Sequence, residues 1–465
     1  MKREKYERFP LTAAEKLHLL AVQEYNLPQV VNIGVCLTLH ASLDFGLLKK
    51  CIQMEYERCD SLRLRFTSPA PHGEVMQYII PHEGRDIRFV DFTGKTPAEI
   101  DNAMYGWTAL PFDRYDSPMN EFIMISLPDG YQGIYLRIDH MLTDSCGIIA
   151  MVNDIMELYC HYIFDTPLPG PLFSYKDAVL KDLEKASNPV RTAKHTAFWQ
   201  EQVALGEPIF TSITGPGKLA ESRRKHKDPA LRVSDRQMKD LSVGQSSFFL
   251  EPEPTRRLLD YCMINNVSMT NLFLMGLRTY LSKVNNGEPD ISLRNYVSRR
   301  SSRLSRYSGG TRIHCFPCRT VLSSDTEFLD GILAIQALQN SVYRHVDYDS
   351  VQALQDYLTA YQAPPKTTYE SVALTYQPIP IRLQNENLTH IPYRTKWFTN
   401  GTAIQELYLT VMHNANDLGL EFYFKYQTAQ VSRQDVELLY YYLMRILFTG
   451  IENPEMTVSE IMQAV

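Results

Sequence analysis

The spacing of apolar residues predicts alternating helices and strands in the first part of the chain. Helical spacing, with apolar residues three and four positions apart, is found over residues 11–23, 43–58 and 147–162. Runs rich in apolar and β-branched residues predict strands over residues 30–39, 62–66, 121–127 and 133–138. Residues 62–66 alternate as in a half-buried strand. The last two runs flank Pro128-Asp129-Gly130, a turn sequence because proline fixes φ and glycine accepts a positive φ, so we expect a hairpin.

The second half of the chain repeats this mixture. Strands are predicted over 246–250, 407–411 and 419–426, and helices over 254–264, 269–284 and 434–448. Residues 214–245 differ: they contain Gly215-Pro216-Gly217, a basic run from Arg223 to Lys227 and few large apolar residues, which favours an exposed connection. We therefore expect an α/β protein with an N-terminal lobe (1–210), a linker (211–245) and a C-terminal lobe (246–465). Clefts between such lobes often bind ligands.

Composition and charge argue against several classes of protein, among them nucleic-acid-binding, secreted and transmembrane proteins. The 465 residues are 44% apolar and 22% charged, as in a folded protein. Lys and Arg total 47 and Asp and Glu total 53, so the net charge of −6 gives no general attraction to nucleic acid. The first residues resemble no secretory signal, and the longest apolar stretch, 438–451, is interrupted by Arg445. These features predict a cytoplasmic protein without a transmembrane segment.

The eight cysteines do not indicate a disulfide scaffold or a metal site. Their density is too low for a disulfide-stabilised fold. Cys315 and Cys318 have CxxC spacing, but a structural zinc site needs two further ligands, and the sequence contains no second pair. We interpret the two as small apolar side chains in a strand and expect no metal.

The segment from Asp139 to Ser145 is the candidate for chemistry. His140 follows a predicted strand, and Asp144 lies four residues later at the start of a helix. Histidine accepts and returns protons near neutral pH, and an aspartate at this place caps the helix. A buried histidine held by a capping aspartate, without any chemistry, has the same spacing. Taken alone, the spacing favours this second interpretation.

A resemblance to a known family favours the catalytic interpretation of His140 over the purely structural one. The segment resembles the HHxxxDG motif of the condensation-domain and chloramphenicol-acetyltransferase-like superfamily of CoA- or carrier-dependent acyltransferases. Further segments resemble the family in the same order over nearly the whole chain: Phe9-Pro10-Leu11-Thr12, residues 58–66, Pro111-Phe112-Asp113, Phe198-Trp199 and residues 297–319.

The resemblance implies two chloramphenicol-acetyltransferase-like lobes in a V shape, with a tunnel at their interface. His140 would then be the general base that takes a proton from a hydroxyl or amine acceptor as it attacks a thioester. Asp144 would support the site through an ion pair, for which Arg63 is the candidate. The donor would be acyl-CoA or a phosphopantetheine-linked acyl group on a separate carrier protein, with no permanently bound cofactor, and the enzyme would act as a stand-alone protein.

Two residues depart from the family pattern. Asp139 replaces the first histidine of the motif, and Ser145 replaces its final glycine. A side chain at position 145 would narrow the expected tunnel, which bears on turnover more than on the fold. These departures leave open an alternative: a catalytically silent family member that binds a carrier protein or acyl ligand as a scaffold.

Overall fold

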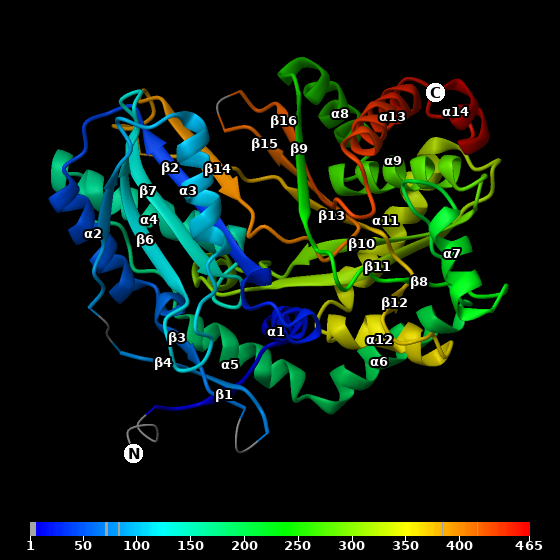
Figure 1. Ribbon diagram of the computed structural model, residues 1–465, viewed down its shortest axis with the longest axis horizontal. Helices are drawn as coiled ribbons and strands as arrows, with labels where there is room; N and C mark the ends of the chain where they lie inside the picture. The colour runs from blue at the N-terminus through cyan, green and yellow to red at the C-terminus, as the bar shows by residue number, and fades with distance from the viewer. Residues whose placement is uncertain (1–5, 70–72, 82–83, 384, 416) are drawn as a thin grey trace. The chain divides into compact units, whose positions relative to one another are not determined.

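The computed structural model describes residues 6–69, 73–81, 84–383, 385–415 and 417–465, and it consists of two compact units (Figure 1). Unit 1 comprises Met1–Asn188, Ser298–Ile313 and Ile381–Gly401. Unit 2 comprises Pro189–Val297, His314–Pro380 and Thr402–Val465. Two segments that unit 1 requires are therefore inserted within the sequence of unit 2.

Unit 1 is built on a five-stranded sheet of order β14-β2-β7-β6-β5. Its pairs are antiparallel except for β5 with β6. The strands of this unit are β1 (Phe9–Pro10), β2 (Asn32–Leu39), β3 (Leu64–Phe66), β4 (Met76–Ile79), β5 (Arg88–Asp91), β6 (Asn120–Ser126), β7 (Gln132–Asp139) and β14 (Tyr393–Phe398). Its helices are α1 (Ala13–Tyr25), α2 (Phe45–Arg58), α3 (Pro97–Ala109), α4 (Ser145–Phe164), α5 (Tyr175–Ala186) and α10 (Arg303–Tyr307). The small strands β1, β4 and β3 form a separate sheet.

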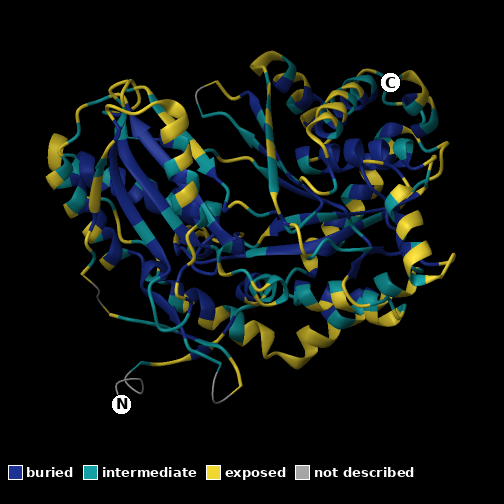
Figure 2. Cartoon of the chain, viewed as in Figure 1, coloured by how far each residue is buried: buried dark blue, intermediate teal, exposed yellow. Residues whose placement is uncertain are grey.

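Alternation along the central strands gives the five-stranded sheet two buried faces. On β7, Ile134, Leu136 and Ile138 join the larger core, whereas Tyr135 joins a smaller cluster with residues of α3. Helices α2 and α4 supply the other side of the larger core, and β2, β6 and β7 are largely buried (Figure 2). The sheet thus lies between two helical layers.

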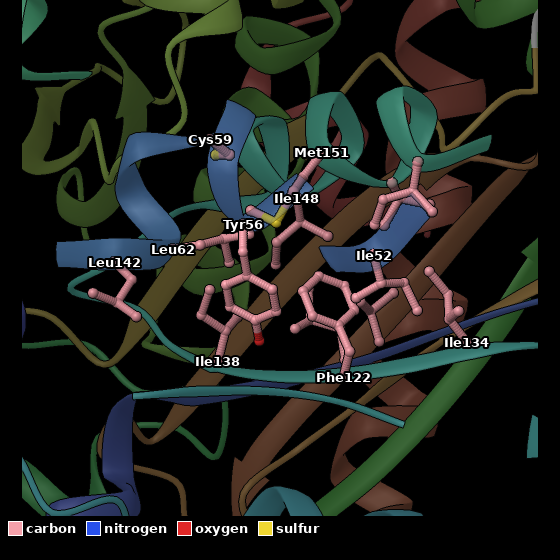
Figure 3. Close-up of a cluster of buried hydrophobic side chains, with 14 of the residues drawn as sticks. Ile52, Tyr56, Cys59, Leu62, Phe122, Ile134, Ile138, Leu142, Ile148 and Met151 are labelled. Atoms are coloured by element: carbon pink, nitrogen blue, oxygen red, sulfur yellow. The ribbon is translucent and has the colours of Figure 1, made fainter. Parts of the chain in front are cut away.

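The larger core reaches the loop that follows β7. Side chains from α2, the sheet and α4 pack together, among them Ile52, Tyr56, Phe122, Ile134, Ile138, Ile148 and Met151 (Figure 3). Leu142, in the loop after β7, is fully buried in the same cluster. Hydrophobic burial therefore fixes the loop that carries the candidate site.

Unit 2 contains a six-stranded sheet of order β11-β10-β13-β15-β16-β9 and a two-stranded sheet of β12 and β8. Its strands are β8 (Ser234–Asp235), β9 (Val243–Leu250), β10 (Asp290–Ser298), β11 (Ile313–Val321), β12 (Thr367–Thr368), β13 (Val372–Gln377), β15 (Leu407–His413) and β16 (Leu420–Gln427). Its helices are α6 (Pro189–Ala204), α7 (Gly217–His226), α8 (Pro252–Ile264), α9 (Met269–Val284), α11 (Phe328–Arg344), α12 (Ser350–Ala360), α13 (Arg433–Glu452) and α14 (Val458–Ala464). The apolar faces of α9 and α13 share one core with the sheet.

The boundaries expected from the sequence require correction. Residues 211–245 are not a connection between lobes, since they lie within unit 2 and contain α7 and β8. Val233 and Ser234 are buried there, so a few well-placed side chains suffice to pack a segment of polar composition. Residues 298–313 and 381–401 belong to unit 1 because long-range pairing, such as β14 with β2, overrides their position in the sequence.

Several local predictions are confirmed. The predicted hairpin is formed by β6 and β7, and the CxxC cysteines are buried in β11.

Residues 62–66 differ from the prediction: a 3-10 turn over Asp60–Arg63 precedes β3, and every residue from 62 to 66 is buried. The alternating arginines are held inside by hydrogen bonds to backbone carbonyls, such as that from Arg65 to Leu64. In the part of the chain that the structure describes, none of the helices combines the length and the apolar composition that a bilayer span requires.

Candidate functional site

The loop between β7 and α4 holds the candidate residues in a fixed turn. His140 donates its backbone N–H to the carbonyl of Val31 at 2.9 Å, which extends the pairing of β7 with β2. The backbone N–H of Leu142 then returns to the carbonyl of Asp139 at 2.9 Å. Together with the burial of Leu142, these bonds set the direction in which His140 leaves the sheet.

Asp139 lies at the end of β7 and is fully buried. Its Oδ2 accepts a hydrogen bond from Nη2 of Arg114 at 2.7 Å, and its Oδ1 accepts the backbone N–H of Met141 at 2.9 Å. An ion pair and a backbone bond compensate for burying this carboxylate. The residue that replaces the first motif histidine is therefore engaged in holding the turn.

Asp144 connects three backbone segments. Its side chain caps α4 by accepting the N–H of Gly147 at 3.0 Å. Arg300 donates to both carboxylate oxygens, through Nε at 3.1 and 3.2 Å and through Nη2 at 2.7 Å. The backbone N–H of Arg312 adds a bond to Oδ2 at 2.9 Å. Because Asp144 and Arg300 are almost wholly enclosed, this forked pair is the main charge compensation at the site.

The expected pairing of Asp144 with Arg63 is wrong. Arg63 donates to the carboxylate of Asp60 at 3.0 Å and to the carbonyls of Tyr56 at 2.7 Å and Ile80 at 2.5 Å. It thereby stabilises the 3-10 turn before β3. Sequence proximity within the first lobe favoured Arg63, whereas the actual partner lies 156 residues further along the chain than Asp144.

The inserted segment 298–313 depends on two glycines. Gly309 and Gly310 have φ of 67° and 71°, values that suit glycine far better than other residues. A Cβ on Gly310 would lie 1.9 Å from the ring of Tyr175. The carbonyl of Gly310 accepts a bond from Arg300 at 2.5 Å, and its backbone forms a parallel bridge to Thr143. The glycine pair therefore lets this segment reach the candidate loop.

The ring of His140 is half-buried and stacks on His18 of α1, with ring centroids 4.1 Å apart and planes 20° apart. Its Nδ1 is enclosed and has no hydrogen-bond partner by distance and angle within the described part of the chain. Burial lowers the pKa of His140 below its usual value, although Asp144 and, more weakly, Asp139 favour the protonated form. A neutral imidazole at neutral pH is the form that accepts a proton.

Glu15 lies three residues before His18 on the buried face of α1. It accepts hydrogen bonds from the N–H of Thr12 at 2.7 Å, from Gln77 at 2.7 Å and from the hydroxyl of Tyr175 at 2.8 Å. Burial nevertheless raises the pKa of Glu15 to about 7, because the donors only partly offset the loss of water. This side chain links α1 to α5 beside the site.

The residues after the motif aspartate are less suited to chemistry. Ser145 begins α4 and is half-buried, and Cys146 follows it. Burial raises the pKa of the Cys146 thiol, so the thiolate needed for a nucleophile is disfavoured. No group of three or more His, Cys, Asp or Glu side chains among the described residues is arranged to hold a metal ion.

The sequence interpretation missed His18, Arg114 and Arg300. Arg300 lies in a segment that the family resemblance had already marked, and the adjacent pair Gly309-Gly310 was a local sign of a special backbone there. His18 carried no comparable sign, because its spacing on α1 matches that of an ordinary buried position.

Nearly the whole chain matches a known protein family. The family model described as Condensation domain matches residues 6–464. Surfactin synthase subunit 1 of Bacillus subtilis (strain 168) is 23% identical over 462 residues, which cover 97% of this chain and 12% of that protein. Tyrocidine synthase 2 of Brevibacillus parabrevis is 19% identical over 455 residues, which cover 97% of this chain and 12% of that protein. The chain thus spans only a small part of these relatives' length.

Solved structures share the fold at low sequence identity. The first condensation domain of the CDA synthetase has a TM-score of 0.78 and 17% identity, with 98% of each chain covered. A mutant starter condensation domain of rhizomide synthetase RzmA, in complex with C8-CoA and Leu-SNAC, has a TM-score of 0.79 and 15% identity, with 97% and 96% covered. The X-domain from teicoplanin biosynthesis, in complex with OxyB, has a TM-score of 0.73 and 18% identity, with 98% and 96% covered.

Proposed function

The chain belongs to the condensation-domain family, and from this premise we propose that it is an acyltransferase that moves an acyl group from a thioester to a hydroxyl or amine. The donor is an acyl-CoA or an acyl group on the phosphopantetheine arm of a carrier protein. The complex of the rhizomide synthetase domain with C8-CoA and Leu-SNAC supports this choice of substrates.

In this proposal, His140 is the general base. Nε2 accepts the proton of the acceptor as its oxygen or nitrogen attacks the thioester carbonyl. The new C–O or C–N bond forms, the C–S bond breaks, and the departing sulfur takes the proton back from the imidazolium. Asp144 and Arg300 position the loop and do not contact the reacting atoms. The observation that carries the proposal is a half-buried imidazole with a lowered pKa on a rigidly held loop.

The test is thiol release from a panel of acyl-CoAs and acyl-loaded carrier proteins, each offered with hydroxyl and amine acceptors. We expect His140→Ala to lower turnover about 10²–10⁴-fold, the usual contribution of a general base. His390→Ala is the matched control, since His390 is exposed on the same unit and should leave turnover unchanged. Turnover that survives His140→Ala would remove this residue from the reaction.

A scaffold without turnover is the second candidate. Two observations favour it: Asp139 occupies the first motif position and is committed to Arg114, and the related X-domain has been solved in complex with another protein, OxyB. The same assay separates the candidates. Wild-type protein that binds acyl-CoA or a loaded carrier but releases no thiol with any acceptor supports the scaffold.

A further inference from the structure

The stacked partner of His140 is a histidine from a different element. His18 comes from α1, and its ring is buried. Its Nε2 lies 3.2 Å from Oγ1 of Thr311 in the inserted segment, so the ring cannot turn freely without losing that hydrogen bond. The two rings are nearly parallel at a centroid distance of 4.1 Å. One face of His140 is therefore covered by an aromatic ring that is itself anchored.

We propose that His18 is a positioning residue for His140, which holds the imidazole by stacking and stabilises the imidazolium formed when His140 takes the acceptor's proton. This inference rests on the proposed function of His140.

Two physical effects support the role. First, no side chain among the described residues bonds Nδ1 of His140, and only the backbone of His140 and Thr143 favours the protonated ring by hydrogen bonding, so stacking adds to the few contacts that orient the imidazole. Second, the face of an aromatic ring attracts a cation, and the attraction grows when both are shielded from water. A ring against His140 therefore favours the charged form that exists only during proton transfer.

Other titratable groups on the elements that form the site remain unchanged in the test. They are Asp139 and Asp144 on its own loop, Glu15 on α1, Cys146 on α4, and Arg300 and Arg312 in the inserted segment. Substitutions confined to His18 leave these charges in place, so a change at His140 reports on the stacked ring.

The experiment compares His18→Phe, which keeps an aromatic face, with His18→Leu, which removes it. The pKa of His140 is measured by NMR of the full chain with labelled histidines, assigned with His140→Ala, and kcat and KM are measured with the best donor and acceptor. For His18→Leu we expect the His140 pKa to fall by about half a unit and kcat to fall about tenfold, with KM little changed. For His18→Phe we expect both values to stay close to wild type.

Equal effects of the two substitutions on the His140 signals would overturn the proposal, and so would a rise of the His140 pKa in both, since that would mean that His18 opposes the imidazolium. His195→Leu is the matched control, because His195 is a buried histidine of unit 2. It should leave the His140 signals unchanged. If His18→Leu does not fold, Thr311→Val removes the hydrogen bond at Nε2 of His18 and should shift the His140 signals in the same direction, and unchanged signals would contradict the proposal.

Failure of the proposed function gives a different result. If His140→Ala turns over like wild type, the base role is lost whatever the NMR shows. If His140→Ala is inactive and His18→Leu matches wild type in both pKa and kcat, the base role stands and the positioning role is lost.

Discussion

His140 combines partial burial with few compensating hydrogen bonds. Burial therefore lowers the pKa of the ring, and the carboxylates of Asp144 and Asp139 offset only part of this shift. The same carboxylates are occupied elsewhere, Asp144 by Arg300 and Asp139 by Arg114. The imidazole thus remains the proton acceptor of the motif that no charged side chain engages through Nδ1 within the described residues.

The lowered pKa of His140 sets the acid side of the pH–rate profile. A general base must be unprotonated, so activity is lost as the pH falls through the pKa of the base. Because that pKa lies below the ordinary value of 6.5 in the free protein, we expect the acid limb of kcat/KM, which reports the free enzyme, to have its midpoint below pH 6.5. The measurement is thiol release between about pH 5 and pH 8, the usual span for a histidine titration, with circular dichroism at each pH to confirm folding. An acid limb above 6.5 would contradict the assignment.

The pair of Asp144 and Arg300 should matter greatly for stability. Arg300→Met leaves a buried carboxylate without its partner, which costs about 3–5 kcal/mol of unfolding free energy. Urea unfolding of the wild type and of Arg300→Met measures this difference in unfolding free energy. Lys95→Met is the control, because Lys95 and Glu99 form an exposed pair four residues apart, whose loss should destabilise the protein far less than loss of the buried pair. Similar losses in the two variants would show that the buried pair contributes little.

At the scale of elements, the site is made by the junction of β7, α4 and the inserted segment 298–313. The side chain of Asp144 caps α4, forms an ion pair with Arg300, and accepts a backbone N–H of the inserted segment at Arg312. One carboxylate therefore connects all three elements. Because the same carboxylate caps the helix and pairs with Arg300, aspartate suits the start of α4 better than Ser, Thr or Asn, which cap helices but carry no charge.

Gly310→Ala tests this junction. The added Cβ would lie 1.9 Å from the ring of Tyr175, and φ of 71° is unfavourable for alanine. We expect a loss of about 2–4 kcal/mol from strain and overpacking together. Gly287→Ala is the matched control: its φ is 79° but no atom lies within 4 Å of the added Cβ, so only about 1 kcal/mol should be lost. Equal losses in urea unfolding would argue against close packing at Gly310.

At the scale of the whole molecule, the two units are interleaved in sequence. The chain passes from one unit to the other after residues 188, 297, 313, 380 and 401. Unit 1 takes its edge strand β14 and the partner of Asp144 from beyond residue 297. Neither unit is therefore a single continuous stretch of sequence.

This connectivity predicts that residues 1–188 alone do not fold stably. The fragment would leave Asp144 buried without Arg300, and β2 would lose its pairing with β14. We expect an insoluble or molten product, judged by near-UV circular dichroism and by NMR dispersion. The control is the same fragment extended by residues 298–313 and 381–401 through flexible linkers, which should recover native signals. A folded fragment 1–188 would contradict this account.

Local structure and the family could be predicted from the amino-acid order alone, whereas the base role of His140 stays a prediction. Periodicity located the helix over 269–284 and the β6–β7 hairpin, because side-chain spacing reflects which face is buried. The motif around His140 indicated the family, which the match over residues 6–464 confirms. Each of these signals lies within a few residues, where bonding geometry limits the possible structures.

The partners of the site residues could be identified only in the folded chain. Arg300 rather than Arg63 binds Asp144, His18 covers His140, and residues 298–313 and 381–401 join unit 1. These choices depend on contacts between residues far apart in the chain, and local spacing carries no record of such contacts. They follow from which packing buries the most apolar surface while leaving the fewest charges unpaired, a property of the folded chain as a whole.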